Sequence, residues 1–188
     1  MSTLKELTWE HHKEAERQEF VKVLLSGNIH PKFYATYIWN QHKKYDLLEA
    51  LAMLHGLFDD LPGIRRKPHI EADFVELWKD STPPVIVPAV NDYIAHMRTI
   101  MDDAEKITAH LYVMHMGELS GGQMIAKKVP GSATMYKFEG DHTALKDAIR
   151  AKTNDSMAEE ARICFDFATR TFKDLMEIDC ERYLEHTD

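Results

Sequence analysis

The segment Gly117–Gln123 reads Gly-Glu-Leu-Ser-Gly-Gly-Gln and lies inside a helical pattern that we expect to run from about Glu105 to Lys128. Each of its glycines costs a helix about 1 kcal/mol relative to alanine. Such a cost is understandable where the backbone must kink or lie almost in contact with a flat ligand. Glu118 and Ser120 place a carboxylate and a hydroxyl within one turn of that bare backbone. We therefore predict a helix that covers a planar ligand.

Composition indicates a soluble globular protein of ordinary proportions. The 188 residues are 44% apolar and 29% charged, and this length suffices for one domain with a sizeable core, which we expect to span residues 1–188. A formal net charge of −8 argues against general nucleic-acid binding. The first residues form no apolar signal sequence, and no stretch approaches the roughly 18 apolar residues of a membrane span. We therefore expect a soluble, cytoplasmic protein without a membrane anchor.

Helix signals recur along the whole chain. Thr3 followed by Glu6 forms a capping box, and Pro31 suits a first helical turn. Ser156 followed by Glu159 forms a second capping box. No strand-like alternation or internal repeat is present in the sequence. We therefore predict an all-α fold with helices over about 3–25, 31–54, 70–79, 88–103, 105–128, 141–152 and 156–184.

A pair of adjacent histidines, His11 and His12, lies in the first predicted helix. Neighbouring residues of a helix point about 100° apart, so only one of the two can face inward. Periodicity alone does not choose between them, and a histidine on a half-apolar helix is most often a surface or core residue. However, a histidine helix opposite a bare, glycine-rich helix describes a haem site with one protein axial ligand and an open sixth position.

Two segments of the chain resemble the haem oxygenase family. Gly117–Gln123 looks like the distal-helix motif of that family, and Leu4–Glu16 resembles its proximal helix. The proximal match includes Glu16 and favours His12 rather than His11 as the axial ligand. Further matching positions are Thr8, Ala15, and the segments 109–112, 145–150 and 160–165, so the resemblance spans most of the chain.

The resemblance implies a fold and an activity. The fold is an all-α, single-domain bundle of the compact soluble bacterial or phage-like type, with haem b between the proximal N-terminal helix and the glycine-kinked distal helix. The activity is that of an enzyme for which haem is both substrate and prosthetic group. With O2 and electrons it opens haem to biliverdin, expected as the IXα isomer, CO and Fe2+. The implied partners are an electron donor such as a ferredoxin or a reductase, and a downstream bilin reductase.

On the proximal side, the resemblance assigns His12 as the metal ligand of haem, a neutral imidazole bound to the iron. Glu16, one turn later, would orient the ring of His12. Phe165 would form part of the apolar wall of the pocket. Trp9 departs from the family, because several members carry a lysine there that helps to bind a haem propionate. We therefore expect one electrostatic contact fewer than in those members.

On the distal side, the resemblance assigns the catalytic role to the glycine segment. Backbone at Gly117, Gly121 and Gly122 would crowd the bound oxygen and direct it towards a meso carbon. Glu118 would order the water that delivers protons, and Ser120 is the neighbouring hydroxyl that provides an alternative anchor. Most members place an aspartate where this chain has Glu118, so the carboxylate extends about one methylene further into the pocket.

The haem propionates would bind a small group of cationic and phenolic side chains. Lys5, Lys146 and Arg150 match cationic positions of the family, and Tyr112 matches a tyrosine that hydrogen-bonds a propionate. Charge-assisted hydrogen bonds are directional, so such a group would fix one rotation of the ring and thereby select the meso carbon. The plainer interpretation is that Lys146 and Arg150 only solvate a helix face, as charged residues four positions apart commonly do.

Three other classes of protein would require different residues in this sequence. A peroxidase would need a distal acid–base group, typically a histidine, but His115 precedes Gly117 by two residues and points to another face. A haem carrier or sensor would have less need of the glycine segment and its carboxylate. A haem-oxygenase-like protein with a two-iron centre would need several inward carboxylates and histidines, and no Glu-x-x-His pattern stands out in the sequence. The raw material for such a centre is Glu14, Glu16, Asp46, Glu49 and His110.

Overall fold

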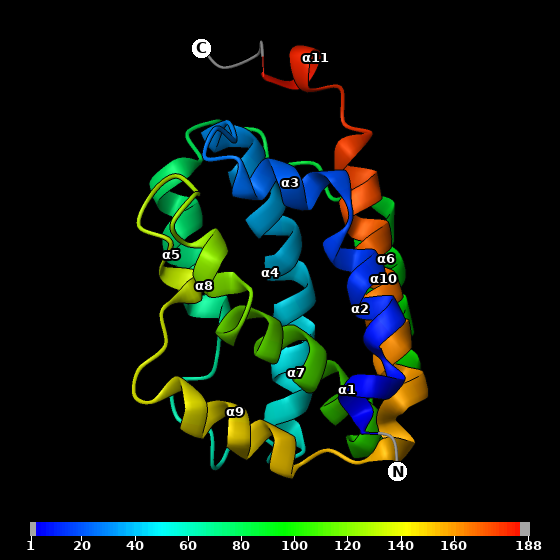
Figure 1. Ribbon diagram of the computed structural model, residues 1–188. Helices are drawn as coiled ribbons and strands as arrows, with labels where there is room; N and C mark the ends of the chain where they lie inside the picture. The colour runs from blue at the N-terminus through cyan, green and yellow to red at the C-terminus, as the bar shows by residue number, and fades with distance from the viewer. Residues whose placement is uncertain (1–2, 185–188) are drawn as a thin grey trace.

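The computed structural model describes residues 3–184, and every regular element in that range is helical (Figure 1). The all-α prediction is therefore confirmed. The α-helices are α1 (Leu4–Leu7), α2 (Trp9–Glu16), α3 (Glu19–Leu25), α4 (Pro31–Leu54), α5 (Lys67–Leu77), α6 (Pro88–Thr99), α7 (Ala104–Leu119), α8 (Gly122–Ile125), α9 (His142–Ala151), α10 (Ala158–Met176) and α11 (Cys180–Leu184). Short 3₁₀ turns lie at η1 (Thr134–Tyr136) and η2 (Asp155–Met157). Within residues 3–184, no helix has the length and apolarity needed to cross a membrane.

The N-terminal helix predicted over 3–25 is divided into α1, α2 and α3. Its cap is confirmed, because the backbone N–H of Glu6 donates to Thr3 Oγ1 at 3.3 Å. The first division follows Thr8, whose hydroxyl donates to the carbonyl oxygen of Leu4 at 2.8 Å. A threonine hydroxyl that bonds the preceding turn in this way competes with the regular helical hydrogen bonds.

The last predicted helix, over 156–184, is also wrong in its boundaries. Ser156 does not cap α10, because it lies in the 3₁₀ turn η2 and its own N–H donates to Asn154 Oδ1 at 2.9 Å. Asn154 therefore caps the turn η2, and α10, which follows it, begins without a side-chain cap. The helix then ends at Met176, and a separate short helix, α11, begins at Cys180.

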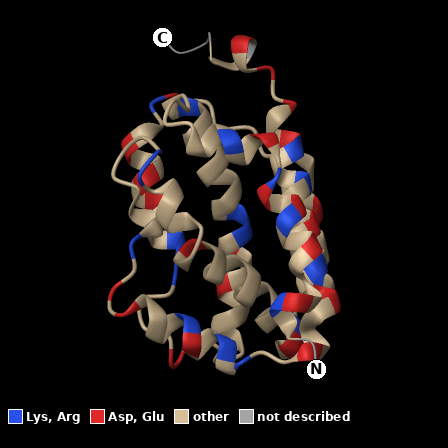
Figure 2. Cartoon of the chain, in the orientation of Figure 1, with Lys and Arg blue, Asp and Glu red and all other residues tan. Residues whose placement is uncertain are grey.

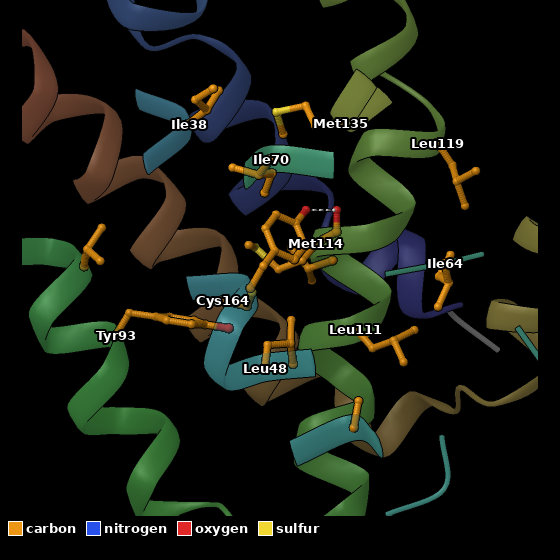
Figure 3. Packing of buried hydrophobic residues seen from close by; sticks show 14 of the residues in the cluster. Ile38, Leu48, Ile64, Ile70, Tyr93, Leu111, Met114, Leu119, Met135 and Cys164 are labelled. Carbon is orange, nitrogen blue, oxygen red and sulfur yellow. Dashed lines mark hydrogen bonds between the residues drawn. The ribbon is translucent and has the colours of Figure 1, made fainter. Parts of the chain in front are cut away.

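Helix α4 runs through the middle of the molecule and packs against α5, α6 and α7 (Figure 1). Pro31 begins it and the positive φ of Gly56, 68°, follows its end, as the sequence predicted. Apolar residues from α4, α6, α7 and α10 meet in the core, which Figure 3 shows around Leu48, Tyr93, Met114 and Cys164. Helix α10 supports both α2 and α7, so it joins the two segments that carry the predicted haem contacts.

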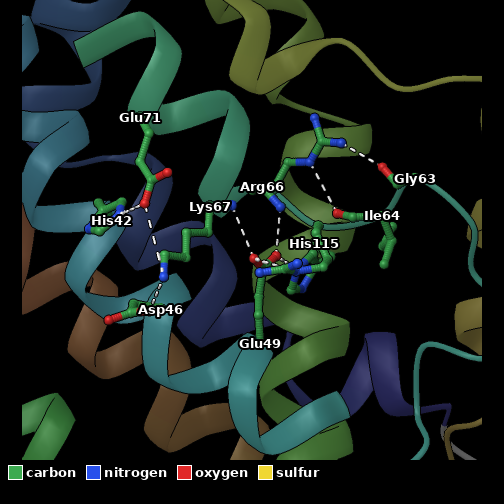
Figure 4. A network of polar contacts seen from close by, with 10 residues as sticks. His42, Asp46, Glu49, Gly63, Ile64, Arg66, Lys67, Glu71 and His115 are labelled. Carbon is green, nitrogen blue, oxygen red and sulfur yellow. Dashed lines mark hydrogen bonds and ion pairs between the residues drawn. The ribbon is translucent and has the colours of Figure 1, made fainter. Parts of the chain in front are cut away.

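A buried polar network fixes α7 against α4 and the chain before α5 (Figure 4). The carboxylate of Glu49 on α4 accepts the backbone N–H groups of Arg66 at 2.6 Å and Lys67 at 3.0 Å. It also lies 2.9 Å from Nε2 of His115 on α7. His115 therefore points into this network, as its spacing from Gly117 predicted. The guanidinium of Arg66, itself fully buried, donates to the carbonyl oxygens of Gly63, Ile64, Met135 and Lys137.

Candidate active site

The glycine segment breaks the helix that contains it. Helix α7 ends at Leu119, and α8 begins at Gly122 after a non-helical Ser120 with φ −107° and ψ −90°. The side chain of Gln123 reinforces the break, because its amide donates to the carbonyl oxygens of Glu118 at 3.1 Å and Tyr136 at 2.7 Å. The break that the three glycines predicted is thus present, at Ser120 and Gly121.

Packing within the protein explains one glycine of the segment but not the other two. Gly122 is buried, and a Cβ there would lie 2.7 Å from a ring carbon of Tyr136 and 3.0 Å from Glu118 Oε2. Packing within the protein therefore accounts for this glycine. Gly117 and Gly121 are exposed, and a Cβ would meet no atom within 4 Å at Gly117 and only the Gly117 carbonyl oxygen, at 3.8 Å, at Gly121. Nothing in the protein's own packing requires glycine at these two positions.

Glu118 turns inward from the exposed backbone beside it. Its side chain is buried, with 8% of the residue surface exposed, and Tyr45 Oη lies 3.1 Å from Glu118 Oε1. Burial raises the pKa of Glu118 to about 7, although the Tyr45 hydrogen bond and the charges of Arg66 and Lys44 lower it. A carboxyl group with such a pKa can give or take a proton near neutral pH.

Sequence reasoning missed Tyr45 and Lys44, both on α4. Lys44 is fully buried, its ammonium lies 5.0 Å from the ring centroid of Tyr93, and burial lowers its pKa to about 8. The available signal was its spacing, because Lys44 falls four residues before the core residue Leu48. Nothing in the sequence linked Tyr45 to Glu118, which lies 73 positions away.

His12 lies on the opposite side of the predicted site and is half-buried, with 37% of its side chain exposed. Its Nε2 lies 2.7 Å from Glu16 Oε1. The orienting role that the resemblance implied for Glu16 stays a prediction. Its ring stacks on Phe165 of α10 at a centroid distance of 5.2 Å, and the edge of Trp9 lies 5.5 Å away. The neighbouring His11 contacts a different carboxylate, since its Nδ1 lies 2.8 Å from Asp166 Oδ1 on α10.

The predicted propionate ligands lie mainly on α7 and α9. Burial raises the pKa of Tyr112 and the charge of Arg150 lowers it, so the two side chains are neighbours across these helices. Arg150 is exposed and also pairs with Asp147, and Lys146 is half-buried one turn earlier. Figure 2 shows basic and acidic residues alternating on α9. Lys5 is exposed on α1, at the other end of the predicted group.

The residues considered for a two-iron centre lie in separate environments. Glu14, Glu16 and Asp46 are exposed and paired with Arg17, His12 and Lys67 respectively. Glu49 is enclosed by the network around His115, and His110 contacts Glu160. Among the described residues, these five do not converge on one point, so they do not form a site for a two-iron centre.

Comparison with known proteins gives one consistent family. The family model described as heme oxygenase matches residues 1–177. Heme oxygenase 2 of Macaca fascicularis is 30% identical, and the alignment covers 92% of this chain and 64% of that protein. Heme oxygenase 1 of Synechocystis sp. is 28% identical over 85% of this chain and 74% of its own length. This chain thus spans less than two thirds of the length of the macaque relative.

Solved structures agree with this assignment. The crystal structure of heme oxygenase-1 from Synechocystis sp. PCC6803 in complex with heme has a TM-score of 0.81 and 25% identity, over 97% of this chain and 94% of that one. Heme oxygenase from Leptospira interrogans has a TM-score of 0.78 and 25% identity, over 90% of this chain and 96% of that one. Since the family model also covers nearly all of the sequence, the chain belongs to the haem oxygenase family.

Proposed function

We propose that this protein is a haem oxygenase that binds haem b between α2 and the glycine segment and opens it to biliverdin, CO and Fe2+. O2 is the co-substrate, and the electrons come from a donor such as a ferredoxin or a reductase. The α isomer of biliverdin is the expected product, and a bilin reductase is the downstream partner. Family membership supports this proposal, as does the haem-bound state of the Synechocystis relative.

The observation that carries the proposal is bare backbone directly beside a buried acid. Gly117 and Gly121 are exposed where no packing within the protein requires glycine. Glu118 lies between them in sequence, is buried, and has a pKa of about 7. A flat ligand on this surface would approach the backbone closely, with a proton donor and acceptor immediately behind it.

The proximal residues fit an iron ligand. When bound, haem supplies the redox-active iron and the macrocycle that is oxidised. His12 is exposed enough to bind a metal, and its contact with Glu16 orients the imidazole and increases its basicity. The ring of Phe165 stacks on the ring of His12 and so restricts its rotation. Of the two neighbours, His12 is the one that stacks on Phe165, the residue expected in the pocket wall, whereas His11 contacts Asp166; this difference supports His12 as the axial ligand.

The distal residues control protons. Tyr45 donates to Oε1 of Glu118, while the cations Lys44 and Arg66 limit the rise of its pKa. Glu118 can therefore hold a proton and pass it to ordered water at neutral pH. The hydroxyl of exposed Ser120 is the second polar group of the segment and can hold water at its outer edge.

The propionates would bind at the α7–α9 side. Tyr112, Lys146 and Arg150 form one group there, and Lys5 on α1 adds a further cation. These side chains offer a phenolic hydroxyl, ammonium groups and a guanidinium group, all of which can donate hydrogen bonds to carboxylates. We propose that they fix the rotation of haem and so select the carbon that is oxidised.

Titration with hemin followed by turnover tests the proposal. The purified protein should bind one equivalent of hemin with a shifted Soret band. Addition of a reductant under air should then remove that band and give the broad red absorption of biliverdin, with one CO released for each haem lost. A complex that survives reduction in air and returns unaltered haem would instead identify a carrier and contradict the enzymatic proposal.

A further inference from the structure

A second cluster of metal-binding side chains lies where α6, α7 and α10 meet. His96 Nε2 on α6 lies 2.5 Å from Glu160 Oε1 on α10. His110 Nε2 on α7 lies 2.8 Å from the same oxygen. The ligand atoms of the three side chains all lie within 4.8 Å of one another. Two imidazoles thus converge on a single carboxylate oxygen contributed by a third helix.

The cluster is distinct from the proposed haem site. His110 and Tyr112 are two positions apart on α7, so they point about 200° apart around the helix. His110 is fully buried and faces α6 and α10, whereas Tyr112 is half-buried beside α9. Nothing in the role proposed for haem uses His96, His110 or Glu160.

The donor set matches that of a transition-metal site. Two imidazole nitrogens and one carboxylate oxygen form the protein ligands of many zinc sites that keep an open position, and of non-haem iron sites. If the cluster served only to hold α7 against α10 by a hydrogen bond, His110 and Glu160 would be sufficient. The second imidazole, His96, is the addition that a metal site explains.

His110 also has the outer contact that metal-bound histidines usually possess. Its Nδ1 lies 3.0 Å from the hydroxyl oxygen of Tyr93. If a cation occupies Nε2, the neutral ring carries its proton on Nδ1 and donates it to Tyr93 Oη. Such a partner fixes the orientation and the tautomer of a ligating imidazole.

Only a small rearrangement is needed to admit a cation. Ligands at about 2.0–2.2 Å from a tetrahedral zinc ion stand about 3.3 Å apart. The two nitrogen–oxygen contacts of 2.5 and 2.8 Å would therefore lengthen by less than about 1 Å. The separation of the two imidazole nitrogens, at most 4.8 Å, would shorten by up to about 1.5 Å. His96, with 23% of its side chain exposed, is the member of the cluster with the most freedom to move.

The cluster opens onto a cavity of about 470 Å³, lined by both His96 and Glu160. Asp103, Glu105 and Glu159 also line it, against one lysine, Lys106. An acidic cavity concentrates cations, and it leaves room for water or another small ligand at an open coordination position.

We propose that His96, His110 and Glu160 form a site for a divalent transition-metal cation of the Zn2+ or Fe2+ class. Two nitrogen ligands favour such borderline cations over Mg2+ and Ca2+, which prefer oxygen ligands. The site is independent of haem binding and requires no haem in the protein.

Cobalt spectroscopy tests the site on the haem-free protein after treatment with a chelator. One equivalent of Co2+ should produce visible d–d bands, Zn2+ should abolish them, and Mg2+ should not. His96→Gln should weaken Co2+ binding by at least about 100-fold, since loss of an outer-shell partner alone costs 10–100-fold. His30→Gln is the matched control, because His30 is an exposed histidine at the start of α4 and should bind Co2+ as the unmodified protein does.

A second pair of measurements separates metal binding from folding. Zn2+ should raise the melting temperature of the unmodified protein and of His30→Gln, but not that of His96→Gln. Tyr93→Phe keeps all three ligands and should weaken Co2+ binding by about 10-fold through loss of the contact to Nδ1. Absence of d–d bands in the unmodified protein, or equal Co2+ affinity in folded His96→Gln, would overturn the proposal.

Discussion

Two buried glutamates beside α7 have opposite acid–base properties. Glu118, near the end of α7, has its pKa raised to about 7 by burial, with Tyr45 as its hydrogen-bonding side chain. Glu160, which contacts His110 in the first half of α7, is also disfavoured as an anion by burial, yet hydrogen bonds from His110 and His96 hold its pKa at about 2. The deeper enclosure of the Glu118 carboxyl group and the two imidazole hydrogen bonds to Glu160 together account for the difference in pKa. This difference supports the proton-transfer role proposed for Glu118 and the proposed role of Glu160 as an anionic ligand.

The largest expected effect concerns the iron of the proposed haem site. His12→Ala should remove the iron–histidine stretch from the resonance Raman spectrum of the ferrous haem complex, since we propose His12, which contacts Glu16, as the axial ligand. His11→Ala should keep the band, because His11 contacts Asp166. Loss of the band in His11→Ala alone would reverse the assignment of the axial ligand.

A second substitution tests proton transfer directly. Glu118→Ala should lower the rate of biliverdin formation by about 100-fold, the lower range for loss of a general acid–base group. Hemin affinity should stay nearly unchanged, because His12 and the exposed glycines are intact. Glu118→Asp should retain substantial activity, since a carboxyl group remains. Equal biliverdin rates for Glu118→Ala and the unmodified protein would leave Ser120, backbone or water as the anchor of the proton network.

A third test uses stability instead of activity. Folding raises the pKa of Glu118 from its ordinary 4.5 to about 7, so the folded protein holds this proton more tightly. The contribution of Glu118 to stability is therefore fully present below about pH 4.5 and is lost as pH rises through about 7. This loss is roughly 3 kcal/mol.

Urea unfolding at pH 5 and pH 8 measures that change. Glu118→Gln should remove it, so that the variant gains stability relative to the unmodified protein as pH rises. Glu159→Gln, at an exposed glutamate, is the control and should follow the unmodified protein at both values. A pH dependence that is the same in Glu118→Gln and the control would show that the burial of Glu118 does not shift its ionisation.

The smallest effect separates the two kinds of glycine near Glu118. Gly117→Ala should leave the fold intact or stabilise it by up to about 1 kcal/mol, because the Cβ meets open space in a helix, yet it should weaken hemin binding. Gly122→Ala should destabilise the fold by about 1–3 kcal/mol, since its Cβ would collide with Tyr136. Thermal unfolding and hemin titration of both variants measure these effects. Unchanged hemin affinity in Gly117→Ala would mean that the ligand does not approach this backbone.

Local signals predicted the helices where one residue type dictates the backbone. Helix α4 matches its predicted bounds because Pro31 can only begin it and Gly56 readily adopts the positive φ that ends it. The divisions at Thr8 and before Cys180 were missed, because neither changes the apolar spacing of the sequence. At Thr8 the cause is a side-chain hydroxyl that bonds the carbonyl oxygen of the preceding turn.

Site residues were predicted where they are close in sequence and missed where folding brings them together. His12 and Glu16 are one helical turn apart, so their contact followed from the spacing. Tyr45 and Glu118 are 73 positions apart, and His96 and Glu160 are 64 apart. Only the packing of α4 and α6 against α7 and α10 creates those pairs. The propionate group stays a prediction that the isomer composition of the product can test.

The buried guanidinium of Arg66 has a consequence for susceptibility to proteases. It donates hydrogen bonds to the carbonyl oxygens of Gly63 and Ile64, between α4 and α5, and of Met135 and Lys137, between α8 and α9. One side chain thus holds both connections in place. A protease must draw about ten residues of chain into its cleft, which requires local unfolding. We therefore expect limited proteolysis to spare the exposed backbone at Gly63 and to begin at exposed turns without such an anchor, such as 26–28. The connection between α8 and α9, which carries Tyr136, should consequently survive digestion that cuts the exposed turns.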